Sequence, residues 1–127
     1  MLNNKPCIFC SISSDRVIAD NALAYAIRDA FPVTDGHLLV IPKRHTENYF
    51  SLTQDELLAC DVLLRQLRND IESKDSAVKG FNIGMNAGEV AGQTVFHCHI
   101  HLIPRREGDV DDPRGGVRHL MPGKGRY

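Results

Sequence analysis

Hydrophobic and polar residues alternate most regularly over residues 96–104, which read Phe-His-Cys-His-Ile-His-Leu-Ile-Pro. In a β-strand successive side chains point to opposite faces, so this alternation predicts a strand with one apolar face and one histidine face. Neighbouring histidines would stand about 6.6 Å apart, which is twice the rise per strand residue. The two faces are formed by Cys98, Ile100 and Leu102 and by His97, His99 and His101.

Four further strands follow from apolar runs bounded by turn residues. Residues 17–19 and 23–28 flank a turn at 20–21 and predict a hairpin. Residues 37–41 form a nearly continuous apolar strand closed by Pro42, which has no N–H to donate to a ladder. Residues 80–86 alternate as a strand.

One long helix is predicted from about residue 54 to about residue 73. Thr53 and Glu56 have the spacing of a capping box, and Leu52 and Leu57 are placed to pack against each other around it. Apolar residues then recur at helical spacing, which predicts a face that packs on the core. That face is formed by Leu57, Cys60, Leu64, Leu67 and Ile71, widened by Leu58 and Val62.

The order of these elements predicts an α+β fold, in which an antiparallel sheet of about five strands carries the long helix on one face. At 127 residues the chain is long enough for one domain, 1–127, with a core from about 7 to 109 and a tail from about 110 to 127.

Composition narrows the possible partners. The net charge of −1 gives no basis for binding long nucleic acid, so local groups must hold any anionic substrate. Residues 1–6 contain no apolar signal core and no run reaches membrane-spanning length, so we expect a cytoplasmic protein without a membrane partner. In that compartment the four cysteines are expected as thiols or metal ligands and not as disulfides.

The histidine face predicts chemistry at phosphorus. Neutral imidazole is a nucleophile that approaches an anionic phosphate without charge repulsion, and neighbouring imidazoles donate hydrogen bonds to phosphate oxygens. His99 has a histidine on each side and is the candidate nucleophile. The preceding loop holds Gly88 and Gly92, where backbone can approach an anion, and polar Gln93 and Thr94. The alternative interpretations are a metal site and an exposed polar face.

The stretch 91–103, Ala-Gly-Gln-Thr-Val-Phe-His-Cys-His-Ile-His-Leu-Ile, resembles the signature of the histidine triad (HIT) superfamily of nucleotide hydrolases and transferases, and residues 35–45 resemble the family's strand with a fourth histidine. The resemblance extends from Cys7 to about Asp109. It implies an α+β domain with a short N-terminal helix that pairs with a second copy into a homodimer. It also implies covalent nucleotidylation of the middle histidine, followed by transfer to water.

The resemblance further implies roles for individual residues. His99 would be the nucleophile, with His101 and His37 assisting at the phosphates. The nucleotide-binding residues would form the base pocket, the ribose contact and the phosphate loop, although pattern alone would equally place Ile27 and Leu39 in the core. These residues are Phe9, Ile27, Leu39, Asp29, Asn86, Gly92, Gln93, Thr94 and Val95.

A Cys-x-x-Cys at Cys7 and Cys10 supplies half of a tetrahedral zinc site. Some bacterial HIT proteins complete this site with two histidines, which correspond here to His45 and His97. A zinc ion that is bound by four protein ligands is a structural ion. The alternative is that Cys7 and Cys10 are reduced thiols in the core. The other cysteines, Cys60 and Cys98, are expected in the core, and His119 on the surface of the tail.

Two branches of the family leave different substrates open. Residues 104–109 resemble the fragile-histidine-triad branch, which splits diadenosine polyphosphates, whereas Asp29 resembles the nucleotide-binding branch, which hydrolyses nucleoside phosphoramidates and acyl-adenylates. We predict a hydrolase of purine nucleotides, with diadenosine polyphosphates as the first candidate substrates. A nucleotide-binding regulator with little turnover is the alternative outside enzymes, and a catalytic metalloenzyme is a further alternative.

Overall fold

The computed structural model of the chain describes residues 7–126. The stretch in which we found no apolar signal core, residues 1–6, lies outside the described residues, as does Tyr127. No helix within the described part is long and apolar enough to cross a membrane.

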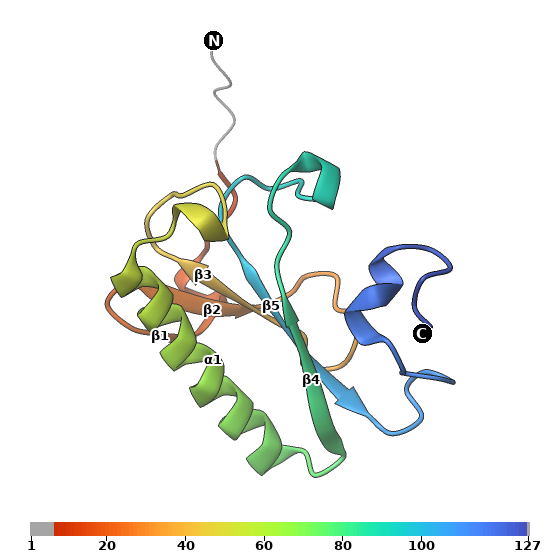
Figure 1. Cartoon of the computed structure of the whole chain (residues 1–127). Helices are drawn as coiled ribbons and strands as arrows, with labels where there is room; N and C mark the ends of the chain where they lie inside the picture. Colours follow the sequence, from red (N-terminus) through yellow and green to blue (C-terminus); the bar gives the residue numbers. More distant parts are fainter. Residues whose placement is uncertain (1–6, 127) are drawn as a thin grey trace.

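Five antiparallel strands form one sheet in the order β1-β2-β3-β5-β4, and a single long helix lies across one of its faces (Figure 1). The predicted α+β class is therefore confirmed. A 3-10 turn at Ser14–Arg16 supplies the short N-terminal helix. The elements are β1 Val17–Asp20, β2 Ala24–Arg28, β3 Leu38–Pro42, α1 Gln54–Lys74, β4 Val78–Gly84 and β5 Ile100–Arg106.

Helix α1 begins at the predicted capping box. The Thr53 hydroxyl accepts a hydrogen bond from the Glu56 backbone N–H at 3.1 Å, and the Glu56 carboxylate accepts one from the Thr53 N–H at 2.9 Å. The predicted apolar face was partly wrong, because Leu63 is fully buried while Leu58 and Val62 are 63% and 49% exposed. At 3.6 residues per turn, Leu58 and Val62 lie on the side opposite the buried line through residues 60, 63 and 67.

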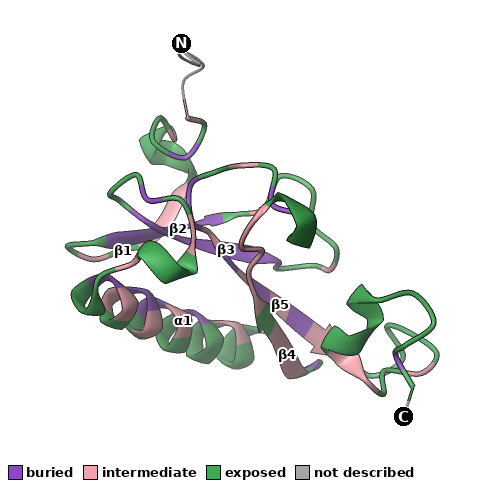
Figure 2. Ribbon diagram, turned by 45° about the horizontal axis from the view of Figure 1, so that its top comes forward, coloured by how far each residue is buried: buried purple, intermediate pink, exposed green. Residues whose placement is uncertain are grey.

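Both faces of the central strands are buried, as the purple segments of β2 and β3 show (Figure 2). On one face the strands pack against α1. On the other face a second apolar cluster joins β2 and β3 to the N-terminal segment, through residues that include Phe9, Tyr25 and Ile41. The Tyr25 hydroxyl donates to the Phe9 carbonyl, and burial raises the pKa of this phenol to about 12.

Strand β5 differs from its prediction at both ends. It begins at Ile100, so His97 and His99 precede the regular strand, and it continues through Pro104 to Arg106. Pro104 lies opposite Phe81 of β4, but its carbonyl points to the other side, where it accepts from the Thr34 hydroxyl at 2.9 Å. On that side β3 pairs with β5 only at residues 100–102, so no strand needs the missing N–H. The C-terminal segment then turns back beside β4 and β5 and forms a 3-10 turn at Gly116–Leu120 (Figure 1).

Candidate active site

The three histidines of the motif do not all share one regular strand face. Cys98, Ile100 and Leu102 are buried as predicted, with exposures of 2%, 3% and 0%. His99 and His101 are partly exposed and their ring centroids are 5.5 Å apart. His97 lies in a bend before β5 and is fully buried, and His99 also precedes the strand, so the prediction of one continuous histidine strand was wrong at its first two members.

A backbone contact fixes the proton on the ring of His99. Its Nδ1 lies 2.8 Å from the carbonyl oxygen of His97. A carbonyl only accepts hydrogen bonds, so the proton of the neutral ring must reside on Nδ1. The Nε2 lone pair is therefore free, which is the form of imidazole that attacks phosphorus. The Phe9 ring packs beside it, with ring centroids 5.0 Å apart.

A second contact fixes the tautomers of His37 and His101. The Val33 N–H donates to His37 Nδ1 at 3.1 Å, so His37 carries its proton on Nε2. That Nε2–H faces His101 Nδ1 at 2.9 Å, which leaves the proton of His101 on its own Nε2. His101 thus has a donor N–H at Nε2, and its ring centroid is 5.5 Å from that of His99.

Burial lowers the pKa of both His37 and His101, and the nearby charge of Asp29 opposes this effect in each case. The Asp29 Oδ2 atom is 3.4 Å from His37 Nε2 and 3.8 Å from His101 Nδ1. A metal ion bound at His37 Nε2 would require a proton on Nδ1, where the Val33 N–H already points. We therefore interpret this group as a hydrogen-bonded histidine pair with a carboxylate beside it.

Cys7, Cys10, His45 and His97 gather in a separate cluster, where all four ligand atoms lie within 4.8 Å of one another. Nδ1 of His97 is 3.4 Å from the Cys7 sulfur and 3.5 Å from the Cys10 sulfur, and Nδ1 of His45 is 3.2 Å from the Cys10 sulfur. Ligands of a tetrahedral zinc ion stand about 3.6 Å apart by the usual zinc–sulfur and zinc–nitrogen bond lengths. The donor set and its spacing therefore fit zinc.

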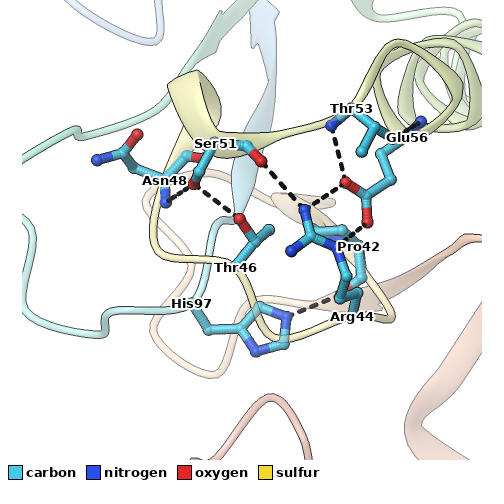
Figure 3. Close-up of polar contacts among 8 residues, drawn as sticks. All are labelled: Pro42, Arg44, Thr46, Asn48, Ser51, Thr53, Glu56 and His97. Carbon is cyan, nitrogen blue, oxygen red and sulfur yellow. Dashed lines mark hydrogen bonds and ion pairs between the residues drawn. The ribbon is translucent and has the colours of Figure 1, made fainter.

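The other ring nitrogen of His97 supports the same interpretation. Its Nε2 lies 2.7 Å from the Pro42 carbonyl oxygen, so Nε2 carries the proton and Nδ1 presents its lone pair to the thiols (Figure 3). A backbone carbonyl that holds the remote ring N–H is a common feature of metal-binding histidines. Burial is the main cause that lowers the pKa of this ring.

The loop that carries His45 is held by hydrogen bonds of the residues on either side, Arg44 and Thr46 (Figure 3). Arg44 donates two hydrogen bonds of 2.8 Å to the Glu56 carboxylate and one of 3.0 Å to the Ser51 carbonyl. The Thr46 carbonyl accepts from the Cys98 N–H at 2.7 Å. The sequence indicates Glu56 as a helix cap and contains no separate signal that pairs it with Arg44.

The glycine loop before His97 has the predicted backbone freedom. Gly88 and Gly92 have φ angles of +98° and +95°, which side chains other than glycine rarely adopt. Gln93, by contrast, is buried, with its side chain used inside the protein: Nε2 donates to the carbonyls of Glu47 and Val95, and Oε1 accepts from the Gly88 N–H. In this conformation the Gln93 amide has no free polar atom for a phosphate, whereas Thr94 is exposed.

The predicted base-pocket residues lie in the second apolar cluster. Ile27 and Leu39 are only 1% and 5% exposed and pack with Phe9 at 8%. These values favour the core interpretation that the sequence left open for Ile27 and Leu39. Asn86 lies beside Gly92 and also lines the cavity described next.

A cavity of about 700 Å³ lies beside the histidine pair, between β4, β5 and the C-terminal segment. His37 and His101 line it, together with apolar residues such as Ile103 and Val117 that we had assigned no role. Its two arginines are both paired. Arg105 binds Asn82 and Asp109, and Arg106 binds Asp75.

The remaining cysteines and the tail histidine lie as expected. Cys60 and Cys98 are buried among apolar residues, and burial raises the pKa values of their thiols to about 11 and about 12. His119 is exposed and its Nε2 bonds the Arg114 carbonyl at 2.9 Å.

Residues 12–108 match the HIT domain family. The chain is 41% identical over 111 residues to an uncharacterized 16.1 kDa HIT-like protein of Mycoplasma pneumoniae, covering 84% of this chain and 76% of that protein. It is 29% identical over 114 residues to adenosine 5'-monophosphoramidase HNT1 of Candida albicans, covering 84% and 75%. The structure resembles that of a Zn-bound histidine triad family protein from Mycobacterium smegmatis, with a TM-score of 0.74, 32% identity and coverage of 90% and 89%.

Proposed function

The chain belongs to the HIT domain family, and we propose that it hydrolyses adenosine nucleotides at the α-phosphate through a covalent intermediate on His99. The observation that carries this proposal is the hydrogen bond from His99 Nδ1 to the His97 carbonyl. It places the proton of the ring on Nδ1 and turns the ring so that Nε2, the nucleophilic atom, is free.

Two displacements complete the proposed reaction. First, His99 Nε2 forms a bond to the α-phosphorus while the bond from phosphorus to the leaving group breaks with its electron pair. Water then attacks the same phosphorus, the bond to Nε2 breaks, and the nucleoside monophosphate is released. The Nε2–H of His101 is placed to donate a proton in the first displacement, and His37 holds that ring in its donor tautomer.

The leaving group distinguishes two substrate classes. Diadenosine polyphosphates are our first candidates from the sequence. A second class, adenosine phosphoramidates and acyl-adenylates, is favoured by the cavity next to His101, because both of its arginines are already paired with acidic or amide groups. Such a cavity gives little compensation for the extra charge of a leaving polyphosphate.

Cys7, Cys10, His45 and His97 would hold a structural zinc ion. With four protein ligands the ion has no open position for substrate, so it would supply folding free energy and not Lewis-acid chemistry. We also propose a homodimer, in which the uncovered edge of β4 pairs with a second copy.

The experiment that tests the function combines turnover with trapping. Wild type is mixed with α-labelled diadenosine triphosphate or α-labelled adenosine 5'-phosphoramidate and quenched in base, where a nucleotidyl-histidine is stable. We expect label on the wild-type protein and none on His99→Ala. A protein that binds adenosine monophosphate but cleaves neither substrate and traps no label would be a nucleotide-binding regulator, and the proposed function would be wrong.

A further inference from the structure

Three side chains from neighbouring strands meet beside the nucleophile. Asp29 follows β2, His37 precedes β3 and His101 lies in β5, and these strands are adjacent in the sheet. The sheet order therefore brings together a carboxylate and two imidazoles that are far apart in the sequence. Their closest atoms are separated by 2.9 Å, 3.4 Å and 3.8 Å.

The two oxygens of Asp29 have different surroundings. Oδ1 accepts a hydrogen bond from the Phe31 N–H at 2.8 Å, which fixes the rotamer of the side chain. Oδ2 faces the ring nitrogens His37 Nε2 and His101 Nδ1. The Asp29 side chain is only 16% exposed, so its charge acts on the rings with little screening by water.

We propose that Asp29 is a positioning residue that allows the histidine pair to hold one additional proton, which His101 delivers to the leaving group. The inference rests on the proposed function and assigns Asp29 a role besides the ribose contact. The additional proton cannot reside on His37 Nδ1, because the Val33 N–H points at that atom. It therefore enters at His101 Nδ1, and both facing N–H groups then need an acceptor. Asp29 Oδ2 is the carboxylate oxygen that faces both nitrogens, at 3.4 Å and 3.8 Å.

His101 loses one proton and regains one proton in each catalytic cycle. In the first step the bond between His99 Nε2 and phosphorus forms, and the leaving group departs with the Nε2 proton of His101. His101 is then neutral, with its Nδ1–H facing the Asp29 carboxylate and its Nε2 free. In the second step this Nε2 takes a proton from the attacking water, which restores the starting charge. Without the carboxylate, the pair returns to the neutral arrangement in which His37 Nε2–H bonds His101 Nδ1.

The groups around the histidine pair have opposite effects on its affinity for a proton. Asp29 favours the protonated form of both rings, whereas burial, His99 and the like charge of the partner ring disfavour it on His101. Of the other charged residues around the adjoining cavity, Arg105 and Arg106 are held by Asp109 and Asp75. Asp35 is exposed at the cavity rim. Removal of the Asp29 charge should therefore lower the pKa of the pair.

The test uses two substrates that differ in their need for a proton. An amine leaving from adenosine 5'-phosphoramidate must be protonated, whereas 4-nitrophenolate leaving from the 4-nitrophenyl ester of adenosine monophosphate needs no proton. Both are prepared with ribose and with 2',3'-dideoxyribose, and the dideoxy form removes any contact of Asp29 with ribose hydroxyls. The variant is Asp29→Asn, because asparagine Oδ1 still accepts from the Phe31 N–H. Asp29→Glu keeps the charge, and Asp61→Asn removes a remote charge on α1.

In single-turnover measurements of leaving-group release, which report the first displacement alone, we expect Asp29→Asn to slow the phosphoramidate about a hundredfold, a typical effect of general acid–base catalysis, and to slow the nitrophenyl ester by less than about threefold. Its pH profile for the phosphoramidate should shift to lower pH, because the pair loses the carboxylate that favours its protonated form. Asp29→Glu should restore part of the rate, and Asp61→Asn should match wild type.

Equal slowing of both substrates by Asp29→Asn would overturn the inference in favour of a purely structural role. An effect that disappears with the dideoxy sugar would overturn it in favour of a ribose contact alone. Both outcomes leave the proposed function intact. A wild type that hydrolyses neither substrate and traps no label would contradict the proposed function itself.

Discussion

Nδ1 of His99 bonds the backbone carbonyl of His97 at 2.8 Å, while the ring of His97 faces the thiols of Cys7 and Cys10. One residue thus orients the candidate nucleophile through its backbone and takes part in the candidate metal centre through its side chain. Residues 97–99 therefore join the candidate metal centre to the candidate nucleophile. Loss of order at one site should disturb the geometry of the other.

His99→Ala should lose several powers of ten in kcat, as expected for removal of a covalent nucleophile. Binding of adenosine monophosphate should remain largely intact, because the proposed pocket is formed by other residues. His101→Ala should lose about a hundredfold, which is typical of one donor to a developing charge. Steady-state kinetics and calorimetric titration measure the two effects. His119→Ala is the control, and a loss in His99→Ala no larger than in this variant would mean that another residue is the nucleophile.

Cys10→Ser should sharply reduce the zinc content of protein purified without added metal, where wild type should contain nearly one ion per chain. The melting temperature should fall, because a structural metal contributes folding free energy. Elemental analysis and thermal melts provide the measurements. Cys60→Ala is the matched control, since Cys60 lies in the core against the sheet, and it should lose stability without losing zinc. A fully folded, metal-free wild type would refute the site.

Much of this architecture follows from local patterns. The period of the apolar residues predicts α1 and all five strands, and the Thr53 and Glu56 pair predicts where the helix begins. Both patterns involve residues that are close in the sequence, and the folded structure contains the elements that they predict. The errors occur where packing against distant segments decides, as at Leu63, which the sheet buries, and at Leu58 and Val62, which α1 turns to solvent.

The sequence predicted which residues belong to the candidate site but not the contacts that they make. The family resemblance implied Cys7, Cys10, His45 and His97 as one group, and the structure brings them together. It could not indicate that Gln93 is used internally, because its hydrogen bonds reach Glu47, which is 46 positions away. The Arg44 and Glu56 pair and the contact of Asp29 with the histidine pair likewise depend on tertiary geometry.

Gln93→Ala should reduce the free energy of unfolding by about 1–3 kcal/mol for each buried polar group that it leaves without a partner. The buried amide joins the Gly88 N–H to the carbonyls of Glu47 and Val95, so three backbone groups lose a bond. Urea unfolding monitors the change. Thr94→Ala, at the exposed neighbouring position, should change stability little. If Gln93→Ala matched Thr94→Ala in stability and differed only in KM, Gln93 would instead contact the ligand.

The protein should be a dimer in solution. Strand β4 is an edge of the sheet, and its Ile83 side chain is 53% exposed. An uncovered edge presents free backbone groups that pair readily with a second chain. Light scattering at micromolar concentration should give about twice the chain mass of 14.2 kDa. Ile83→Lys should shift the equilibrium toward monomer, whereas Leu58→Lys on the exposed side of α1 is the control. A wild-type mass near that of one chain would contradict the proposal.

The ion pair between Arg44 and Glu56 should make stability depend on pH in the acid range. Hydrogen bonds from Arg44 are the main cause that lowers the pKa of Glu56 to about 2 from an ordinary value of 4.5. The folded protein thus binds this proton more weakly than the unfolded chain, so the stabilisation is complete above the unfolded pKa. It is lost as pH falls from about 4.5 toward 2.

Glu56→Gln removes this titration and retains an oxygen that accepts from the Thr53 N–H. Its free energy of unfolding should lie on the order of 2 kcal/mol below wild type at neutral pH, and the difference should shrink toward pH 2. Other acidic groups and the metal ligands titrate equally in both proteins, so they cancel in this difference. Urea unfolding at several pH values measures it, and Glu72→Gln, at an exposed pair with Arg68, should remain close to wild type. A gap between Glu56→Gln and wild type that stays constant with pH would show that the carboxylate stabilises α1 by capping alone.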